Sequence, residues 1–401
     1  MRCRLLALLI TLLLSPLALG TDWRQFRGTD STGHADGGAP AKFDVDKNVA
    51  WKTALPGRGL SSPIVVGGRV FVTASGGPKQ DRLQVLALDA ESGKQLWQRT
   101  FWATGPTDSH PKTSMAAPTP VSDGKRVVAL FATGDVAALD PDGNVLWLRS
   151  LYEENPGATD GRGLASSPLL IAGTVVVQVE TQNTSFVAGI DPTTGKNRWR
   201  VERPREPNWT TPIAIPGDEG KPLVLIQGTS RLSALDPATG KEVWSLNHRS
   251  DPIASSVLSA KVLYVPGEKA LAALELQGNA APKLLWKQAK LNPAMASPVI
   301  LSGRIYSLRQ GGFLVAGDLK TGEVVGQLRL KGPFSASLVT AGGLLYCVNE
   351  SGQAQVVRPD DKDGQVIARG DLGETMLGTP AIVDGAIYLR GEKHLWKMAQ
   401  R

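Results

Sequence analysis

Residues 232–244 read Leu-Ser-Ala-Leu-Asp-Pro-Ala-Thr-Gly-Lys-Glu-Val-Trp, a pattern that predicts a β-hairpin. The carboxylate of Asp236 can accept hydrogen bonds from the turn amides, and Pro237 presets φ at the next position. Gly240 can adopt the left-handed conformation that closes the turn, and the second strand carries Trp244. One such stretch is weak evidence for a fold, but the chain repeats it.

The hairpin recurs along the chain with the same order of Asp, Gly and Trp. In three further copies the pattern decays, because the loop before Trp286 is longer and Gly326 and Ala368 stand where Trp is expected. The complete copies are Asp89/Gly93/Trp97, Asp191/Gly195/Trp199 and, with a turn one residue shorter, Asp140/Gly143/Trp147.

A second repeated feature precedes each hairpin: two small residues, usually followed by Pro, and then an apolar strand. Eight such starts occur, roughly 40 to 55 residues apart, a period typical of propeller blades. They are Ser61-Ser62-Pro63, Ala116-Ala117-Pro118, Ser166-Ser167-Pro168, Thr210-Thr211-Pro212, Ser255-Ser256-Val257, Ala296-Ser297-Pro298, Ala336-Ser337-Leu338 and Gly378-Thr379-Pro380.

The sequence therefore predicts an all-β fold, a single eight-bladed β-propeller over residues 48–401. Small residues suit the inner strands, which converge on a narrow channel. The last repeat supplies only three strands, Thr379–Val383, Ala386–Arg390 and Leu395–Met398. The strand at residues 48–55 is expected to supply the fourth and so close the ring. Tryptophans are expected to dock neighbouring blades: Trp51, Trp97, Trp147, Trp199, Trp244 and Trp286.

Residues 1–20 have the features of a secretory signal peptide: Arg2 and Arg4, an apolar core at 5–14, and small residues at 18–20. That core is too short for a stable transmembrane helix, so we expect no membrane span and export to the periplasm or cell envelope. Residues 21–47, which begin near Trp23-Arg24-Gln25-Phe26-Arg27-Gly28, are expected to pack on the propeller as a lead segment. The alternative is a poorly ordered arm.

The chain carries a net charge of +7, and removing Arg2 and Arg4 with the signal leaves +5. The basic residues are scattered through turns, which indicates solubility and no nucleic-acid partner. Apart from Cys3 in the signal, the only cysteine is Cys347, which we expect to be a buried apolar filler.

No motif for nucleophilic, metal or phosphate chemistry occurs, so we assign no catalytic or metal-binding residue. Residues 360–364 are similar to part of a calcium loop, but Pro359 occupies the first ligand position and no Glu closes the loop.

The segments that precede the inner strands are expected to gather around the channel mouth. Gly57-Arg58-Gly59 recurs as Gly161-Arg162-Gly163, and a long insertion holds His110. Arginine forks and aromatic faces around a concavity suit a planar anion or an extended peptide. The alternative is that these residues only tie loops together. The candidates for ligand or partner binding are Arg58, His110, Arg162, Arg205, Trp209, His248 and Arg249.

The Ala-Leu-Asp-x-x-Thr-Gly-x-x-x-Trp hairpin resembles the repeat of pyrrolo-quinoline quinone (PQQ)-like β-propellers. That group includes quinoprotein alcohol dehydrogenases and the propeller subunit of the outer-membrane β-barrel assembly machine. Residues 23–28 and 48–53 look like the start of exported, stand-alone members. The resemblance implies, for an enzyme, PQQ at the channel mouth with a cation held by Glu and Asn, a catalytic Asp, a stacking Trp and often paired adjacent cysteines. This chain has no adjacent cysteines, and no Glu/Asn/Asp set matches residue by residue.

Three function classes stay open. The leading hypothesis is an exported, monomeric, non-catalytic scaffold that binds another envelope protein or peptide. The alternative is a small PQQ-dependent dehydrogenase of alcohols or sugars, with PQQ as a possible cofactor near Arg58, Arg162 and Trp209. A third is a hydrolase or lyase built on loop residues such as His110 and His248.

Overall fold

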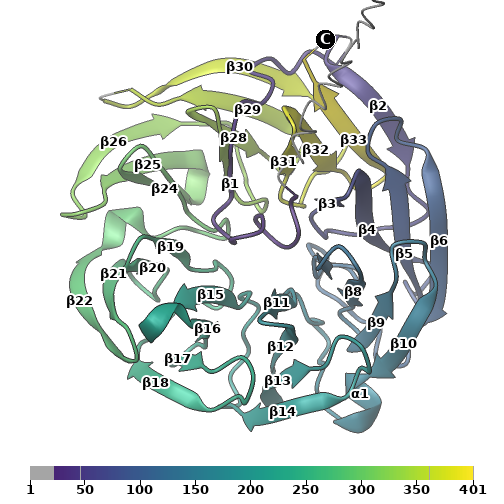
Figure 1. The fold of residues 1–401 in the computed structure, drawn as a ribbon. Coiled ribbons are helices and arrows are strands. Elements are labelled where there is room, and N and C mark those ends of the chain that lie inside the picture. The colour runs from purple at the N-terminus through teal and green to yellow at the C-terminus, as the bar shows by residue number, and fades with distance from the viewer. Residues whose placement is uncertain (1–21, 46, 361, 401) are drawn as a thin grey trace, which may run out of the picture.

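Eight sheets stand around a common axis in the computed structural model, which describes residues 22–45, 47–360 and 362–400 (Figure 1). Each sheet is one blade of four antiparallel strands, and a short parallel strand joins one of them. Within the described chain, helix is limited to α1 (Leu151–Glu154) and three short 3-10 segments, Asp218–Gly220, Ala289–Leu291 and Gln310–Gly312. The predicted all-β, eight-bladed propeller is confirmed.

The first four blades follow one another along the chain. Blade 1 contains β3 (Ile64–Val66), β4 (Arg69–Gly76), β5 (Arg82–Asp89) and β6 (Gln95–Trp102). Blade 2 contains β7 (Val121–Ser122), β8 (Val127–Leu130), β9 (Asp135–Leu139) and β10 (Val145–Ser150). Blade 3 contains β11 (Leu169–Ile171), β12 (Thr174–Glu180), β13 (Ser185–Ile190) and β14 (Asn197–Glu202). Blade 4 contains β15 (Ile213–Pro216), β16 (Pro222–Gln227), β17 (Arg231–Leu235) and β18 (Glu242–Asn247).

The remaining blades complete the ring. Blade 5 contains β19 (Val257–Ser259), β20 (Val262–Val265), β21 (Leu271–Gln277) and β22 (Ala280–Gln288). Blade 6 contains β23 (Val299–Leu301), β24 (Arg304–Arg309), β25 (Phe313–Asp318) and β26 (Val324–Arg329). Blade 7 contains β27 (Val339–Ala341), β28 (Leu344–Val348), β29 (Gln353–Arg358) and β30 (Gln365–Asp371), with β1 (His34–Ala35) added beside β27. Blade 8 contains β31 (Ala381–Val383), β32 (Ala386–Arg390), β33 (His394–Ala399) and β2 (Val49–Ala54).

Blade 8 is assembled from the two ends of the described chain. Strand β2 pairs antiparallel with β33, so that Trp51 lies opposite Lys397 and Thr53 opposite Leu395. This pairing gives the last blade its fourth strand and confirms the predicted closure. Because β2 and β33 are far apart in sequence, the ring closes only when the amino-terminal strand docks.

Five of the seams between blades are built from a tryptophan over a glycine. The ring of Trp51 lies over Gly93 of the next blade, which leaves no room there for a side chain and suits the positive φ of 70°. The indole N–H donates to Ala90 O at 3.2 Å. Trp97, Trp147, Trp199 and Trp286 repeat this arrangement on Gly143, Gly195, Gly240 and Gly322.

Trp244 differs from the other seam tryptophans. It is buried, but its indole nitrogen has no hydrogen-bond partner among the described residues. The next hairpin, between β21 and β22, lacks the turn that begins with Asp, in which the carbonyl of the residue after Asp accepts this bond at the other five seams. The local decay of the repeat therefore removes one bond from the seam.

A ring of side-chain hydroxyls connects the blades at the start of their inner strands. At each step a backbone N–H of one blade donates to the hydroxyl oxygen of the equivalent residue in the next blade, at 2.9 to 3.1 Å. The seven steps run in order through Ser62, Thr119, Ser167, Thr211, Ser255, Ser297, Ser337 and Thr379.

The hydroxyl ring corrects the expected register of two repeats. In blade 2 the equivalent of Ser62-Pro63 is Thr119-Pro120, two residues beyond the alignment expected from Ala116-Ala117-Pro118. In blade 5 it is Ser255-Ser256, one residue before the expected position. The hydroxyl, which accepts the bond from the preceding blade, defines the repeat better than the small residues around it.

Residues 22–35, the first part of the lead segment, cross the end of the channel opposite the mouth. Trp23 exchanges backbone hydrogen bonds with Val65 of blade 1, at 2.8 and 3.0 Å. Gly33 O accepts from Thr340 N of blade 7, which only blade 8 separates from blade 1, at 2.8 Å, and β1 continues this pairing. Figure 1 shows the amino-terminal chain lying within the ring beside blade 7.

Arg27 lies in the middle of the lead segment and is only 1% exposed. Its guanidinium donates to Thr32 O at 3.0 Å, to Ser256 O at 3.3 Å and to Pro298 O. Ser256 and Pro298 each follow a hydroxyl-ring residue, in blades 5 and 6. Burial lowers the pKa of Arg27 to about 10, which leaves it charged at neutral pH. The lead segment therefore ties together inner strands from several blades.

Candidate functional site: the channel mouth

A cavity of about 430 Å³ opens at the end of the channel away from the lead segment. Every blade contributes one residue to its lining, always the residue two positions before the hydroxyl-ring position. These eight side chains are mainly apolar and only partly buried: Leu60, Ala117, Ala165, Trp209, Ile253, Met295, Ser335 and Leu377. We call this set the mouth ring.

An insertion between blades 1 and 2, residues 103–115, reaches across the mouth. Near its tip, Lys112 Nζ lies 2.9 Å from Glu350 Oε1 on the β28–β29 turn of blade 7. Arg58 donates to Pro111 O and pairs with Glu392 of blade 8 at 3.2 Å. The insertion, called the strap below, is thus held on two sides of the rim, and His110 on it lines the cavity.

The predicted site arginines do not converge as a group. Arg162 lines the cavity, with its guanidinium 5.7 Å from the centre of the Trp209 ring, a cation–π geometry. Arg58 binds the strap beside the cavity instead of lining it. Arg205 is exposed, and Arg249 pairs with Glu268 at 2.9 Å while both side chains stay in solvent.

The two histidines occupy different environments. His110 is exposed on the strap, where its Nδ1 accepts from Lys112 N at 3.1 Å. His248 follows the outer strand β18 and does not line the cavity. Burial, helped by the nearby charge of Lys287, lowers the pKa of His248, and its Nε2 is buried without a hydrogen-bond partner among the described residues. The structure therefore brings together His110, Arg162 and Trp209, but not His248.

Apart from Trp209, the residues of the mouth ring were not predicted from the sequence. Its members share no residue type, because Leu, Ala, Trp, Ile, Met and Ser all occur. The available signal was positional: each lies two residues before the repeated hydroxyl, so a correct repeat register identifies all of them.

The mouth does not fit a PQQ–cation site of the kind that the enzymes imply. No carboxylate lines the cavity, and Glu350 at its rim is engaged by Lys112 and by the hydroxyl of Ser335 at 2.7 Å. Across the described residues, no three or more His, Cys, Asp or Glu side chains gather in a way that could hold a metal ion. The cation ligands are therefore missing at the place where the cofactor would bind.

Other buried reactive groups are occupied by structural contacts. Burial raises the pKa of the Cys347 thiol, which makes it unreactive at neutral pH. Glu180 pairs with Arg203 at 2.8 Å between blades 3 and 4, where burial raises the pKa of Glu180 and the arginine opposes that rise. Neither group reaches the mouth cavity.

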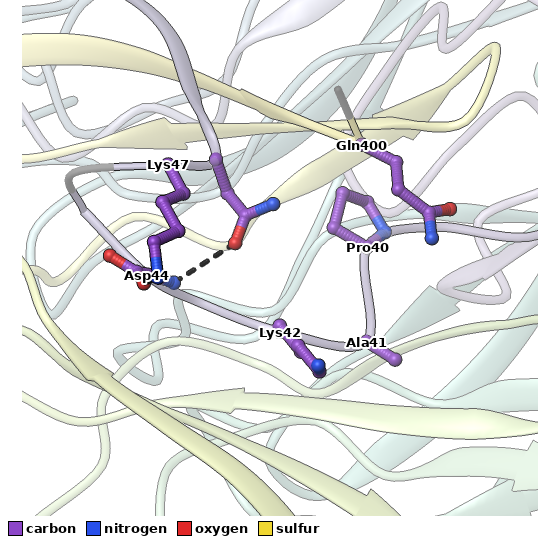
Figure 2. Close-up of a pocket in the computed structure, with 7 residues that line it drawn as sticks. Pro40, Ala41, Lys42, Asp44, Lys47 and Gln400 are labelled. Carbon is purple, nitrogen blue, oxygen red and sulfur yellow. Dashed lines mark hydrogen bonds and ion pairs between the residues drawn. The ribbon is translucent and has the colours of Figure 1, made fainter.

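A second hollow, of about 670 Å³, lies where the lead segment joins β2, and Figure 2 shows its lining. Lys47 Nζ lies 3.5 Å from Asp44 Oδ2, and Asp44 N donates to Asn48 Oδ1 at 3.1 Å. The hollow is lined by one turn of the lead segment, β2-flanking residues and Gln400, so it lacks the convergence of all eight blades seen at the mouth.

The family model for outer membrane protein assembly factor BamB matches residues 35–188, 183–337 and 310–401. BamB from Moraxella catarrhalis has a similar fold, with 18% identity, a TM-score of 0.63, and coverage of 89% of this chain and 95% of BamB. A europium-containing methanol dehydrogenase gives a TM-score of 0.71 at 14% identity, over 93% of this chain and 90% of the enzyme. Quinohemoprotein alcohol dehydrogenase from Comamonas testosteroni gives 0.69 at 14%, over 94% and 80%. No curated protein matches this sequence.

Proposed function

Since the chain belongs to the family of outer membrane protein assembly factor BamB, a family of PQQ-like repeat propellers, we propose that it is a non-catalytic scaffold of the cell envelope that binds a partner protein at the channel mouth. The carrying observation is the mouth ring, because eight blades deliver partly exposed, mainly apolar side chains to one cavity. Concave apolar surfaces that remain open to solvent are typical of binding sites.

The mouth selects the chemistry of the segment it binds. Its lining includes Leu60, Met295 and Leu377, and Met adapts its shape to different apolar side chains. Arg162 and His110 stand at the rim, and no carboxylate lines the cavity. The fitting segment therefore inserts an apolar side chain and carries a carboxylate beside it.

Among the described residues, no helix is long and apolar enough to cross a membrane. Placement in the envelope rests on the family and on the predicted signal at residues 1–20, which lies outside the described residues. The proposal assigns no reaction to the mouth.

Site-specific photo-crosslinking in living cells tests the proposed function. A crosslinking side chain at position 377 is expected to give a discrete protein adduct that disappears when Ile253→Asp is added. The matched control is position 285, which is 44% exposed on β22 and far from the mouth. Secreted, folded protein that gives no adduct from position 377, or the same adduct from position 285, contradicts the proposal.

An anaerobic titration of the purified protein with PQQ and Ca²⁺, followed by absorbance, tests the dehydrogenase alternative. The mouth lacks cation ligands, so we expect a flat titration and no dye reduction with alcohols or sugars. Saturable micromolar binding together with dye reduction would replace the scaffold by an enzyme.

A further inference from the structure

Three basic side chains line one hollow between blades 6 and 7, called the blade 6–7 hollow below. Arg329 ends β26, Lys331 lies in the connection from β26 to β27, and Arg369 lies on β30. The hollow has a volume of about 710 Å³, and no acidic side chain lines it. The rest of its lining consists of Gly311, Leu330, Gly332 and Pro333.

The backbone beneath this hollow is fixed by buried amide side chains. Lys331 N donates to Gln355 Oε1 at 3.0 Å, and Lys331 O accepts from Gln355 Nε2 at 2.9 Å and from Asn349 Nδ2 at 2.8 Å. Gln355 and Asn349 are both buried. Arg369 lies directly opposite Gln355 in the β29–β30 pairing, so both side chains leave the same face of the sheet. The fold therefore places Lys331 and Arg369 around one hollow.

The three positive charges are not neutralised by acidic side chains of the described chain. Arg329, Lys331 and Arg369 form no ion pair with any described residue. Arg329 lies over the Phe313 ring, with its guanidinium 4.5 Å from the ring centre, and this cation–π contact orients the group while leaving its charge uncompensated. The hollow thus gathers positive charge that has no counter-charge in the lining.

Two acidic residues near this hollow are held by other groups. Glu350 N donates to Pro333 O at 2.9 Å, but the Glu350 carboxylate pairs with Lys112 on the strap. Asp371, also on β30, accepts from Gly373 N at 2.9 Å through its Oδ1. Neither carboxylate lines the hollow.

The next seam has the opposite charge at the equivalent position. Leu330 and Leu372 both follow an outer strand and donate their backbone N–H to a glycine carbonyl of their own blade, at 2.8 and 3.0 Å. The residue before them is Arg329 in blade 6 and Asp371 in blade 7, and Glu374 follows shortly after the latter. The positive lining is therefore particular to one seam and is not a consequence of the propeller fold.

We propose that the blade 6–7 hollow binds a phosphorylated molecule through a pyrophosphate or phosphate-ester group. Arginine forks match the paired oxygens of a phosphoryl group, and several negative charges are needed to meet Arg329, Lys331 and Arg369 together. Gly332, also in the lining, adds a backbone N–H that has no partner among the described residues. The volume exceeds that of a single phosphate and falls within the range of about 300–1,000 Å³ typical of ligand sites.

This site is separate from the channel mouth. The two cavities share no lining residue, so the proposal holds whether or not a partner binds at the mouth.

Calorimetric titration of the purified chain with inorganic pyrophosphate tests the proposal. Saturable binding that weakens with added salt is expected. Arg329→Gln should weaken it about tenfold, the loss of one charge-assisted hydrogen bond. Arg82→Gln is the matched control, because Arg82 is also exposed and lies over an aromatic ring, that of Trp102, at 5.5 Å in blade 1. It should bind pyrophosphate like the wild type.

Modification of the wild-type protein by phenylglyoxal, mapped by mass spectrometry, locates the bound anion without any variant. Pyrophosphate is expected to protect Arg329 and Arg369 but not Arg82. Sedimentation with phosphatidylcholine vesicles, with or without phosphatidic acid, identifies the source of the phosphoryl group. Binding to phosphatidic acid that pyrophosphate displaces assigns a lipid headgroup, whereas pyrophosphate binding without vesicle binding assigns a free phosphorylated molecule.

Four results would overturn the proposal. They are no binding of pyrophosphate at millimolar concentration, equal losses in Arg329→Gln and Arg82→Gln, equal modification of Arg329 and Arg369 with and without pyrophosphate, and tighter binding of a capped polyglutamate peptide than of pyrophosphate. The last result would assign the hollow to an acidic protein segment instead.

Discussion

The two ends of the central channel are built from the same eight strands but are used in opposite ways. At one end the lead segment crosses the axis and buries Arg27 almost completely. At the other end the mouth ring stays partly exposed, and Arg162 remains in solvent beside Trp209. The closed end ties inner strands of several blades together, while the open end leaves mainly apolar side chains partly exposed.

The contrast is clearest in the two arginines. Nη1 and Nη2 of Arg27 donate to three backbone carbonyls, one in the lead segment and two in blades 5 and 6. Arg162 makes one cation–π contact and no ion pair within the described chain. A buried charge with fixed acceptors holds structure in place, whereas an exposed one is available for recognition.

The largest expected effect comes from Arg27→Ala. The substitution leaves buried carbonyls without a donor and opens a cavity on the axis, so we expect a loss of about 4 kcal/mol in the free energy of unfolding. Urea unfolding followed by tryptophan fluorescence measures this loss. Arg162→Ala is the matched control and should change stability by less than about 0.5 kcal/mol. Equal effects at both positions would remove the distinction between the two ends.

An intermediate effect is expected in the hydroxyl ring between the two ends. Ser297→Ala removes the acceptor of Ser255 N, so one buried N–H loses its bond, at a cost of about 1–2 kcal/mol. Ser62→Ala should cost much less, because Ser62 Oγ has no hydrogen-bond partner among the described residues. The measurement is again urea unfolding. A loss of unfolding free energy at Ser62 as large as that at Ser297 would contradict the inference that each hydroxyl acts as the acceptor for the preceding blade.

The smallest effect on stability is expected at the mouth. Leu60→Ser with Leu377→Ser should lower the free energy of unfolding by no more than about 1 kcal/mol, since both side chains are already partly exposed. The same double variant should abolish the crosslinked adduct formed from position 253. A large stability loss with the adduct retained would show that the mouth ring is core and not a binding surface.

The sequence predicted the ring because its local signals are strong. A turn that begins with Asp and ends with Gly predicts a hairpin, and the Trp of each repeat fits over the glycine of the next blade. Fold and closure could therefore be predicted from positions such as Gly93 and Trp51. Both signals act within one repeat or between adjacent ones.

The mouth could not be predicted with the same success. Its residues are related only by register, and two repeats were placed one or two residues away from their true alignment at Thr119 and Ser255. The position of the strap is also hard to predict from the sequence. Lys112 on the strap pairs with Glu350 across the mouth, and these two residues are 238 positions apart in sequence. Long-range pairs of this kind depend on the closed ring and leave no local pattern.

The hydroxyl ring has a sense of rotation. Every bond is given by one blade and received by the following one, and within the described chain the step from Thr379 back to Ser62 is missing from this series. The inner strands are thus linked by seven equivalent hydrogen bonds, and the one missing link lies between blade 8, which is made from both chain ends, and blade 1. Because each link joins only two adjacent blades through the same backbone N–H and hydroxyl, a propeller with one blade more or fewer would need no new type of contact between its inner strands.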